Sequence, residues 1–220
     1  MYLSRIQASS QTDQLRRLAH IAGGGQYRIH QALWNLFDRD PDASRDFLYR
    51  QEGQADKLSF LVLSKREPNN NEGLWSVQTK AFAPRLKVGQ RLRFSVRVNP
   101  VIKRRDESGK QVRHDLVMDL RKRSGEAERS QAELVQQATR QWLSTRAEAN
   151  GFTVHANSLI GEAYRQWRFK GKGGRSICFS TIDCAGLLTV ADIERFQALL
   201  FSGLGPAKAF GCGLFLIRPD

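Results

Sequence analysis

Tyr27 and His30 carry the side chains near the start of the chain that are best suited to moving protons. They follow three consecutive glycines, and the apolar residues after them recur with a helical period. Residues three apart on a helix lie on the same face, so the phenol and the imidazole would lie side by side. Together they can do general acid and base chemistry at neutral pH. Such a pair is also common as packing at the edge of an amphipathic helix, and both interpretations stay open on spacing alone.

The positive charge of the chain is concentrated in two windows. The whole chain has 35 Lys and Arg against 22 Asp and Glu, a net charge of +13. Residues 85–130 hold 14 basic and 6 acidic residues, and residues 164–175 hold 5 basic and no acidic residues. The rest of the chain is therefore neutral overall. This distribution predicts a surface for a polyanion, and nucleic acid fits better than an acidic membrane because neither window has the apolar face of an interfacial helix.

Other features argue against a membrane protein, a secreted protein and a metal site. No run of about 18 apolar residues is present, and the first residues lack the apolar core of a signal peptide. Three cysteines without CxxC spacing argue against a disulfide framework and a zinc site, and suit a reducing cytoplasm. No His, Cys or carboxylate grouping has convincing metal-ligand spacing, so we expect no metal and no cofactor.

Hydropathy patterns in the first part of the chain predict the elements that must position Tyr27 and His30. Residues 9–25 are expected to form a loop to which 15–21 add a helical turn or two. The expected strands are 2–8, 47–50, 58–64 and 75–82, and the expected helix is 27–37. This β-α-β-β-β order is that of a ferredoxin-like fold whose second helix is reduced to a short connection.

The second part of the chain predicts a more complete unit of the same kind. Residues 91–98 alternate strictly between apolar and polar or cationic positions, and 103–110 read as a protruding charged turn. Ser130 and Glu133 match a capping box at the start of a helix. The expected strands are 91–98, 152–161, 164–169, 176–188 and 213–217, and the expected helices are 130–150 and 191–202.

The predicted fold class is therefore α+β, with two tandem ferredoxin-like (RRM-like) domains and a C-terminal glycine-rich loop. Residues 1–84 would form the domain with His30, and residues 85–220 the domain with the basic windows and the loop. A single elaborated α+β domain is the alternative. The sheet of this fold is a common platform for RNA.

The glycine-rich run contains Gly203, Gly205, Lys208, Gly211 and Gly213. It lies between a predicted helix and a predicted strand, the reverse of a dinucleotide-binding loop, and it lacks the Walker pattern. Bare backbone amides and Lys208 could lie against phosphates. A helix cap followed by a β-bulge would use the same glycines for geometry alone.

The motif Tyr-x-x-His-Gln-x-Leu-Trp-x-Leu-Phe from Tyr27 to Phe37, the segment from Pro41 to Leu48 and the glycine-rich run resemble a known family. It is that of the CRISPR RNA-processing endoribonucleases of the type I-E Cascade complex (CasE type, RAMP superfamily). The resemblance implies two ferredoxin-like domains and metal-free cleavage of the CRISPR repeat transcript at the base of a hairpin. It implies that His30 is the essential histidine and Tyr27 a helper, and leaves open whether His30 is the acid or the base. Other Cascade subunits are the implied protein partners.

Basic and glycine residues are expected to meet the CRISPR repeat RNA hairpin, mainly through its phosphates. The basic candidates are Arg28, Lys103, Arg104, Arg105, Arg113, Arg168, Lys170, Lys172, Arg175 and Lys208, and the glycines are Gly203, Gly205, Gly211 and Gly213. Among rival histidines, His20 is expected in an unstructured stretch. Two alternatives remain: a catalytically inactive scaffold that binds RNA hairpins, and an interaction protein that binds no RNA.

Overall fold

The computed structural model describes residues 1–9, 15–23, 25–37, 46–52, 58–70, 73–105, 107–123, 129–170, 174 and 176–220. The chain divides into two compact units. The first unit contains Met1–Arg85 and Ala207–Leu214, and the second contains Leu86–Pro206 and Phe215–Asp220. The predicted boundary after residue 84 stays a prediction. The compact units differ from it because Arg85 and residues 207–214 belong to the first unit.

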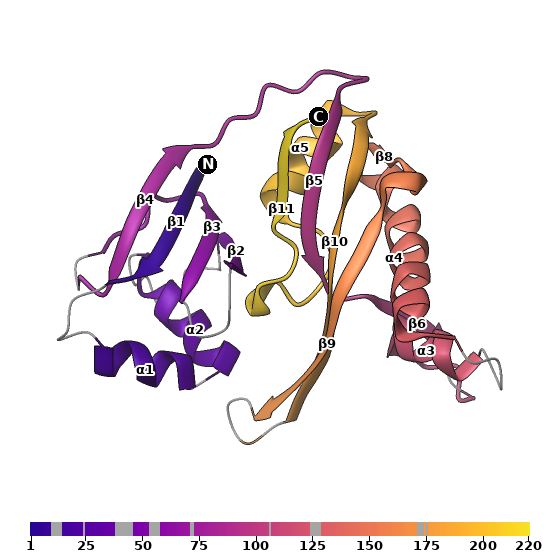
Figure 1. Ribbon diagram of the computed structural model, residues 1–220, viewed down its shortest axis with the longest axis horizontal. Helices are drawn as coiled ribbons and strands as arrows, with labels where there is room; N and C mark the ends of the chain where they lie inside the picture. Colours follow the sequence, from indigo (N-terminus) through magenta and orange to yellow (C-terminus); the bar gives the residue numbers. More distant parts are fainter. Residues whose placement is uncertain are drawn as a thin grey trace. The chain divides into compact units, whose positions relative to one another are not determined.

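The first unit is built on a four-stranded antiparallel sheet in the order β2-β3-β1-β4. Figure 1 shows these strands side by side in that order. The strands are β1 (Tyr2–Ala8), β2 (Phe47–Glu52), β3 (Ser59–Ser64) and β4 (Trp75–Ala81). Two helices, α1 (Leu15–Gly23) and α2 (Gly25–Trp34), connect β1 to β2. The helical turns expected over 15–21 are confirmed, and α1 extends beyond them to Gly23, so the loop expected at 22–23 is wrong.

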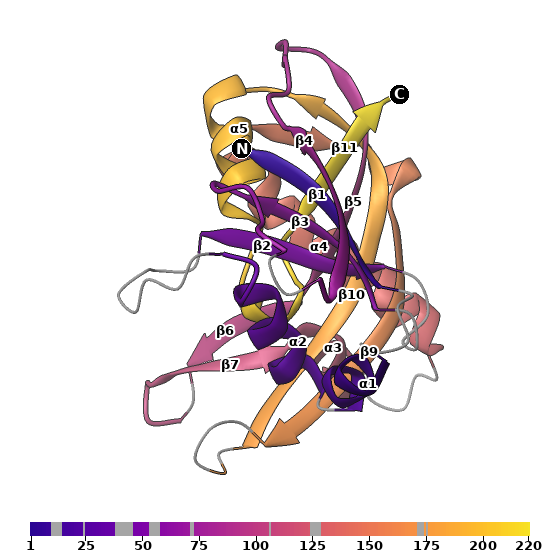
Figure 2. The same ribbon diagram turned by 90° about the vertical axis from the view of Figure 1, so that its left-hand side faces the viewer.

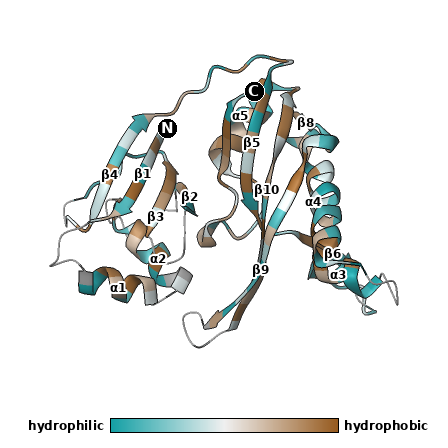
Figure 3. Cartoon of the chain, viewed as in Figure 1, coloured by the Kyte–Doolittle hydropathy of each residue, from teal (hydrophilic) through white to brown (hydrophobic). Residues whose placement is uncertain are grey.

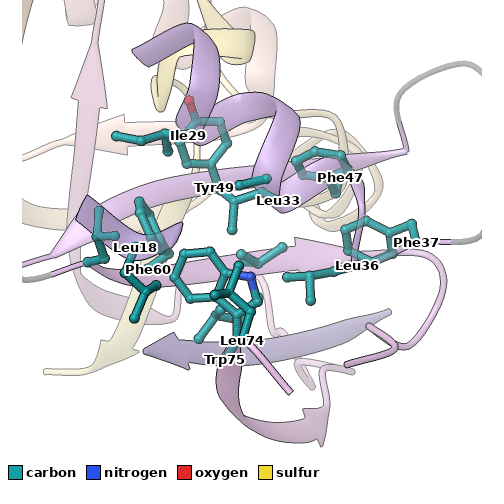
Figure 4. Packing of buried hydrophobic residues seen from close by; sticks show 14 residues of the cluster. Leu18, Ile29, Leu33, Leu36, Phe37, Phe47, Tyr49, Phe60, Leu74 and Trp75 are labelled. Carbon is teal, nitrogen blue, oxygen red and sulfur yellow. The ribbon is translucent and has the colours of Figure 1, made fainter. Parts of the chain in front are cut away.

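The helices cover one face of this sheet and bury its apolar side chains. Leu18 from α1 and Ile29 and Leu33 from α2 pack with Phe60 of β3 and Trp75 of β4 (Figure 4). All five side chains are buried. Each buried side chain of this size stabilises the fold by about 1.5–3 kcal/mol relative to an exposed one. This packing holds α2, and with it His30, firmly on the sheet.

The second unit repeats this sheet arrangement and, unlike the described part of the first unit, has both helices expected of a ferredoxin-like fold. Its sheet has the order β11-β5-β10-β8, with β9 paired to β10, and all pairs are antiparallel. The strands are β5 (Arg91–Val98), β8 (Phe152–Val154), β9 (Ile160–Lys170), β10 (Ser176–Val190) and β11 (Phe215–Pro219), and the helices are α4 (Gln131–Ala147) and α5 (Ile193–Ser202). Figures 1 and 2 show β9 and β10 running together past the end of β5.

The capping box predicted for α4 is confirmed. The Glu133 backbone N–H donates to Ser130 Oγ at 3.3 Å, and the Ser130 N–H donates to Glu133 Oε2 at 2.8 Å. The helix buries Leu134, Trp142 and Leu143 and is mostly hydrophilic on the surface that Figure 3 shows. Amphipathic periodicity thus places this helix correctly from sequence.

One predicted strand of the second unit is wrong. The expected strand 152–161 is interrupted, because β8 ends at Val154 and a 3₁₀ turn, η3 (Ala156–Ser158), precedes β9. β9 then runs unbroken from the last two residues of this segment through the strand predicted at 164–169. At Gly161 an added Cβ would lie 2.0 Å from Thr139 Oγ1, so this glycine permits β9 to approach α4 closely.

The expected charged turn at 103–110 is an ordered hairpin. β6 (Val101–Arg105) pairs with β7 (Gln111–Asp115), and Figure 2 shows them as a two-stranded ribbon. A further helix, α3 (Leu116–Arg123), follows β7 and was not predicted. Asp115 Oδ1 accepts the backbone N–H groups of Val117 and Met118, which caps the start of α3. Across the described helices, none is long and apolar enough to cross a bilayer.

Candidate active site

His30 is half-buried on α2 among three aromatic rings. Its ring centroid lies 5.7 Å from that of Trp34, 5.9 Å from that of Phe47 and 6.3 Å from that of Tyr49. The Phe47 and Tyr49 rings are stacked on it, and its Nδ1 atom is buried. This leaves Nε2 as the candidate ring nitrogen for contact with a substrate. Because α2 begins at Gly25, two residues before the helix expected at 27–37, His30 lies in the second helical turn.

The C-terminal glycine-rich run contributes directly to the surroundings of His30. The Tyr49 hydroxyl donates to the Ala209 carbonyl oxygen at 3.0 Å, across 160 positions of sequence. The short helix η5 (Lys208–Phe210) packs against α2 and β2, the elements that carry His30 and Tyr49. Gly211 has φ +79°, and an added Cβ would lie 3.3 Å from Cε2 of Tyr49. Lys208 thus lies on η5, which packs beside α2, the helix that carries His30.

The other glycines of the run have geometric roles that the structure accounts for. Gly203 ends α5 with φ 78°, and its N–H donates to the Leu199 carbonyl at 2.8 Å. Gly205 has φ +75°, and an added Cβ would lie 2.8 Å from Cη2 of Trp142. Gly213 has φ 89° and is buried. Gly203 and Gly205 belong to the second unit, so the glycine-rich run is split between the two units after Pro206.

Of the candidate residues Tyr27 and Arg28, which precede His30 on α2, the structure describes only Arg28 fully. The backbone of Tyr27 lies in α2, but its side chain lies outside the described part of the chain. Arg28 hydrogen-bonds through Nη1 to the ring Nε2 of His20, and also donates to the His20 carbonyl at 3.2 Å. His20 lies on α1, so its predicted place in an unstructured stretch is wrong.

The β6–β7 hairpin brings three of its four candidate cations to one face. Lys103 lies directly opposite Arg113, and alternation along β6 puts Arg105 on the same side. All three side chains are exposed. Like charges directly opposite one another on paired strands are destabilising, so this placement favours a site for an anion.

Arg104 lies on the other face of the hairpin and is paired within the protein. Its Nε and Nη2 atoms each donate to an oxygen of Asp119 on α3 at 2.7 Å. The hydrogen bonds from Arg104 hold the pKa of Asp119 below its ordinary value, and Asp119 in turn raises the pKa of Arg104. The structure therefore separates Arg104 from the other three candidates.

The β9–β10 hairpin carries the second group of candidate cations. Arg168 is exposed and pairs in register with Cys178. The ring of Trp167, on the opposite face, stacks on that of Phe179 with centroids 6.3 Å apart. The backbone of residue 170 pairs with Ser176. The side chain of Lys170, and the whole of Lys172 and Arg175, lie outside the described residues.

Sequence reasoning missed the residues that support the candidates. Phe47 and Tyr49 hold the His30 ring, and Asp119 pairs with Arg104. A tyrosine in the apolar strand segment Phe47–Tyr49 was a signal that its hydroxyl needed a partner. In the part of the chain that the structure describes, no group of three or more His, Cys, Asp or Glu side chains could hold a metal ion.

A comparison with protein families identifies the relatives of this chain. A family model described as "CRISPR associated protein" matches residues 1–219. The chain belongs to this CRISPR-associated protein family. This chain is 31% identical over 201 residues to the CRISPR system Cascade subunit CasE of Escherichia coli (strain K12). The match covers 88% of this chain and 92% of that protein. This chain is also 31% identical over 209 residues to the CRISPR-associated endoribonuclease Cse3 of Thermus thermophilus, covering 88% and 90%.

Solved structures of CRISPR-associated proteins have the same fold. The crystal structure of Cas6e from Escherichia coli K-12 matches with a TM-score of 0.68 at 26% identity, over 100% of both chains. Thermus thermophilus Cse3 bound to an RNA representing a pre-cleavage complex matches with a TM-score of 0.69 at 28% identity, over 99% of this chain and 98% of that one. These neighbours have two ferredoxin-like domains. Both the family resemblance and the predicted fold class are confirmed.

Proposed function

We propose that this chain is a metal-independent endoribonuclease that binds the hairpin of the CRISPR repeat and cuts precursor CRISPR RNA at the base of the stem. The observation that carries the proposal is the half-buried imidazole of His30, held by aromatic rings beside the element that begins with Lys208. The 31% identity to a protein named an endoribonuclease supports it, as does the similarity to a structure of that protein with RNA bound.

The reaction that suits this site is attack of a ribose 2′-hydroxyl on the adjacent phosphate. The 2′-oxygen forms a bond to phosphorus, and the bond from phosphorus to the 5′-oxygen breaks. The products are a 2′,3′-cyclic phosphate and a 5′-hydroxyl. One proton leaves the 2′-hydroxyl and one is delivered to the leaving oxygen, and His30 Nε2 carries out one of these two transfers. Tyr27 assists in the same part of α2, and Lys208 stabilises the added negative charge.

The basic hairpins supply the surface for the RNA stem. The exposed cations Lys103, Arg105 and Arg113 on β6–β7, and Arg168 on β9, contact phosphates, because the deep groove of A-form RNA hides its base edges. Within this scheme residues 1–84 form the catalytic domain and residues 85–220 the domain that grips the stem. Arg28, Lys170, Lys172, Arg175 and the four glycines complete the proposed RNA contacts.

The protein partners follow from the relatives. One relative is named a Cascade subunit. We infer that this chain stays on its cleaved product and joins other Cascade subunits, in the cytoplasm where the precursor RNA is made. A catalytically inactive scaffold that only binds the hairpin is the alternative.

Cleavage of the matching repeat RNA in EDTA tests the proposal. Wild type is expected to cut, and His30→Ala to cut about 10²–10⁴-fold more slowly, the usual contribution of a general acid or base. Hairpin affinity, measured by fluorescence anisotropy, should stay within about twofold because His30 provides chemistry more than binding. His155→Ala is the matched control, since this exposed histidine bonds Thr189 in the second unit.

Two outcomes would contradict parts of the proposal. Equal cleavage by wild type and His30→Ala would remove His30 from the reaction. Tight hairpin binding by a wild-type protein that never cuts would favour the scaffold.

A further inference from the structure

A groove of about 730 Å³ in the first unit is lined by α1, by residues 28–37 and by residues 69–70 and 74–75. It is separate from the surroundings of His30, which is not among its lining residues. Its basic side chains are Arg16, Arg17 and His20 from α1 and Arg28 from α2. None of the lining residues that the structure describes is acidic. The described lining residues therefore carry a net positive charge, with no carboxylate among them to compete with an anion.

The groove and His30 lie on opposite flanks of α2. Each helical residue turns the chain by about 100°, so Arg28 and His30 point about 160° apart around the axis. Asn35, seven positions after Arg28, returns to the Arg28 flank and also lines the groove. The buried Ile29 and Leu33 lie between the two flanks and face the core. One helix thus presents two distinct sites.

The walls of the groove have both polar and apolar parts. The bonds from Arg28 to the ring and carbonyl of His20 tie α1 to α2 along the basic wall. Trp75 and Leu36 form part of the apolar wall. Asn70 is occupied in closing a turn, because its amide bonds both the N–H and the carbonyl of Trp75. Asn35 and Asn69 add further amides to the lining.

We propose that this groove binds a segment of single-stranded RNA, an inference that rests on the proposed function for the presence of RNA beside the hairpin. Arg16, Arg17 and Arg28 contact phosphates, and a base lies against the apolar wall within reach of the Asn35 amide. The volume is in the range of ligand pockets of about 300–1,000 Å³, which suits one or two nucleotides and not a duplex. Cationic grooves with apolar walls are the usual design for single-stranded nucleic acid.

Fluorescence anisotropy with labelled dodeca-uridine RNA tests the groove in the full-length His30→Ala protein, which keeps the probe uncut. Arg16→Gln/Arg17→Gln should weaken binding about tenfold and reduce the slope of log K against log salt by about 1.4, the value for two phosphate contacts on a single strand. Lys80→Gln/Arg140→Gln is the matched control: it removes two exposed charges that do not line the groove and should change Kd less than twofold.

Photocrosslinking with 4-thiouridine in the same oligonucleotide gives a readout that does not depend on the arginine variant folding. Crosslinks to peptides that contain Asn35 or Trp75 are expected. Equal Kd values for the double variant and the control, or crosslinks confined to the β6–β7 and β9–β10 hairpins, would overturn the groove assignment. Cleavage of the repeat hairpin by wild type is scored separately, so failure of the groove and failure of the proposed function are distinguishable.

Discussion

At the scale of single residues, the position of His30 depends on side chains from two elements. Trp34 comes from α2 itself, whereas Phe47 and Tyr49 come from β2. Tyr49 is fully buried and its hydroxyl binds the Ala209 carbonyl, so the glycine-rich run helps to hold the ring that stacks on His30. A change in this run should therefore reach the reaction through Tyr49.

Gly211→Ala tests this connection. The substitution places a methyl group 3.3 Å from the Tyr49 ring at a residue with φ +79°, so we expect a loss of stability of about 1–2 kcal/mol from the backbone and a several-fold slower single-turnover cleavage rate from the displaced ring. Gly89→Ala is the matched control, because Gly89 has the same φ of +79° and nothing within 4 Å of an added Cβ. Thermal melting and rapid-quench kinetics measure the two effects. Equal cleavage rates for the two variants would show that Tyr49 does not transmit the change.

At the scale of elements, the β6–β7 hairpin is anchored both near its turn, at Arg104, and at its base, at Asp115. Arg104 of β6 pairs with Asp119 of α3, and the Tyr164 hydroxyl on β9 donates to Asp115 Oδ2 at 2.8 Å. Burial and the bond to Asp115 both raise the pKa of Tyr164, so it stays a neutral donor. These contacts orient the hairpin and leave Lys103, Arg105 and Arg113 on its exposed face.

The Arg104–Asp119 pair should make stability depend on pH. Because the pKa of Asp119 is lowered in the folded state, its contribution is present above the unfolded value near 4 and is lost as pH falls through the folded value. Asp119→Asn should therefore lower the melting temperature at pH 7, and its difference from wild type should shrink below about pH 4. Melting curves from pH 7 to pH 3 measure this, with Glu148→Gln as an exposed control. A difference that stays constant across this range would mean that Asp119 acts by packing and not by charge.

At the scale of the whole molecule, the net charge of +13 is carried by the windows that contain the two basic hairpins. If their exposed cations neutralise phosphates, affinity for the repeat hairpin must fall with salt, because each contact releases condensed counterions. An interaction protein that does not bind RNA would show no such dependence.

The salt slope of the full-length protein therefore measures how many of these cations are used. Lys103→Gln/Arg105→Gln/Arg113→Gln should reduce the slope of log K against log salt by about 2.7, at about 0.9 per phosphate of a helical stem. Arg5→Gln/Lys80→Gln/Arg140→Gln removes the same charge from exposed positions elsewhere and should leave the slope almost unchanged. Titrations at four or more salt concentrations give both slopes. An unchanged slope in the hairpin variant would remove β6–β7 from the RNA surface.

Local sequence patterns were enough to predict several elements of this protein and its family. The alternation across Arg91–Val98 gave β5 with its observed bounds, and the Ser130–Glu133 capping box marked the start of α4. Both depend on neighbours within a few residues, and on the period of the element itself. The motif around His30 and the glycine-rich run likewise indicated the family from the sequence alone. The two basic windows predicted a surface that binds a polyanion.

Tertiary contacts decided what no local pattern encodes. The Ala209 carbonyl accepts a hydrogen bond from Tyr49, 160 positions away in sequence, and Arg104 pairs with Asp119 instead of joining the exposed cations. Helix α1 places Arg16, Arg17 and His20 beside Arg28. The single strand expected over 152–161 is instead β8, a 3₁₀ turn and the start of β9, which packs closely on α4 at Gly161. The reason is physical: periodicity specifies which face of an element is buried, whereas the partner that buries it is chosen by packing between elements distant in sequence.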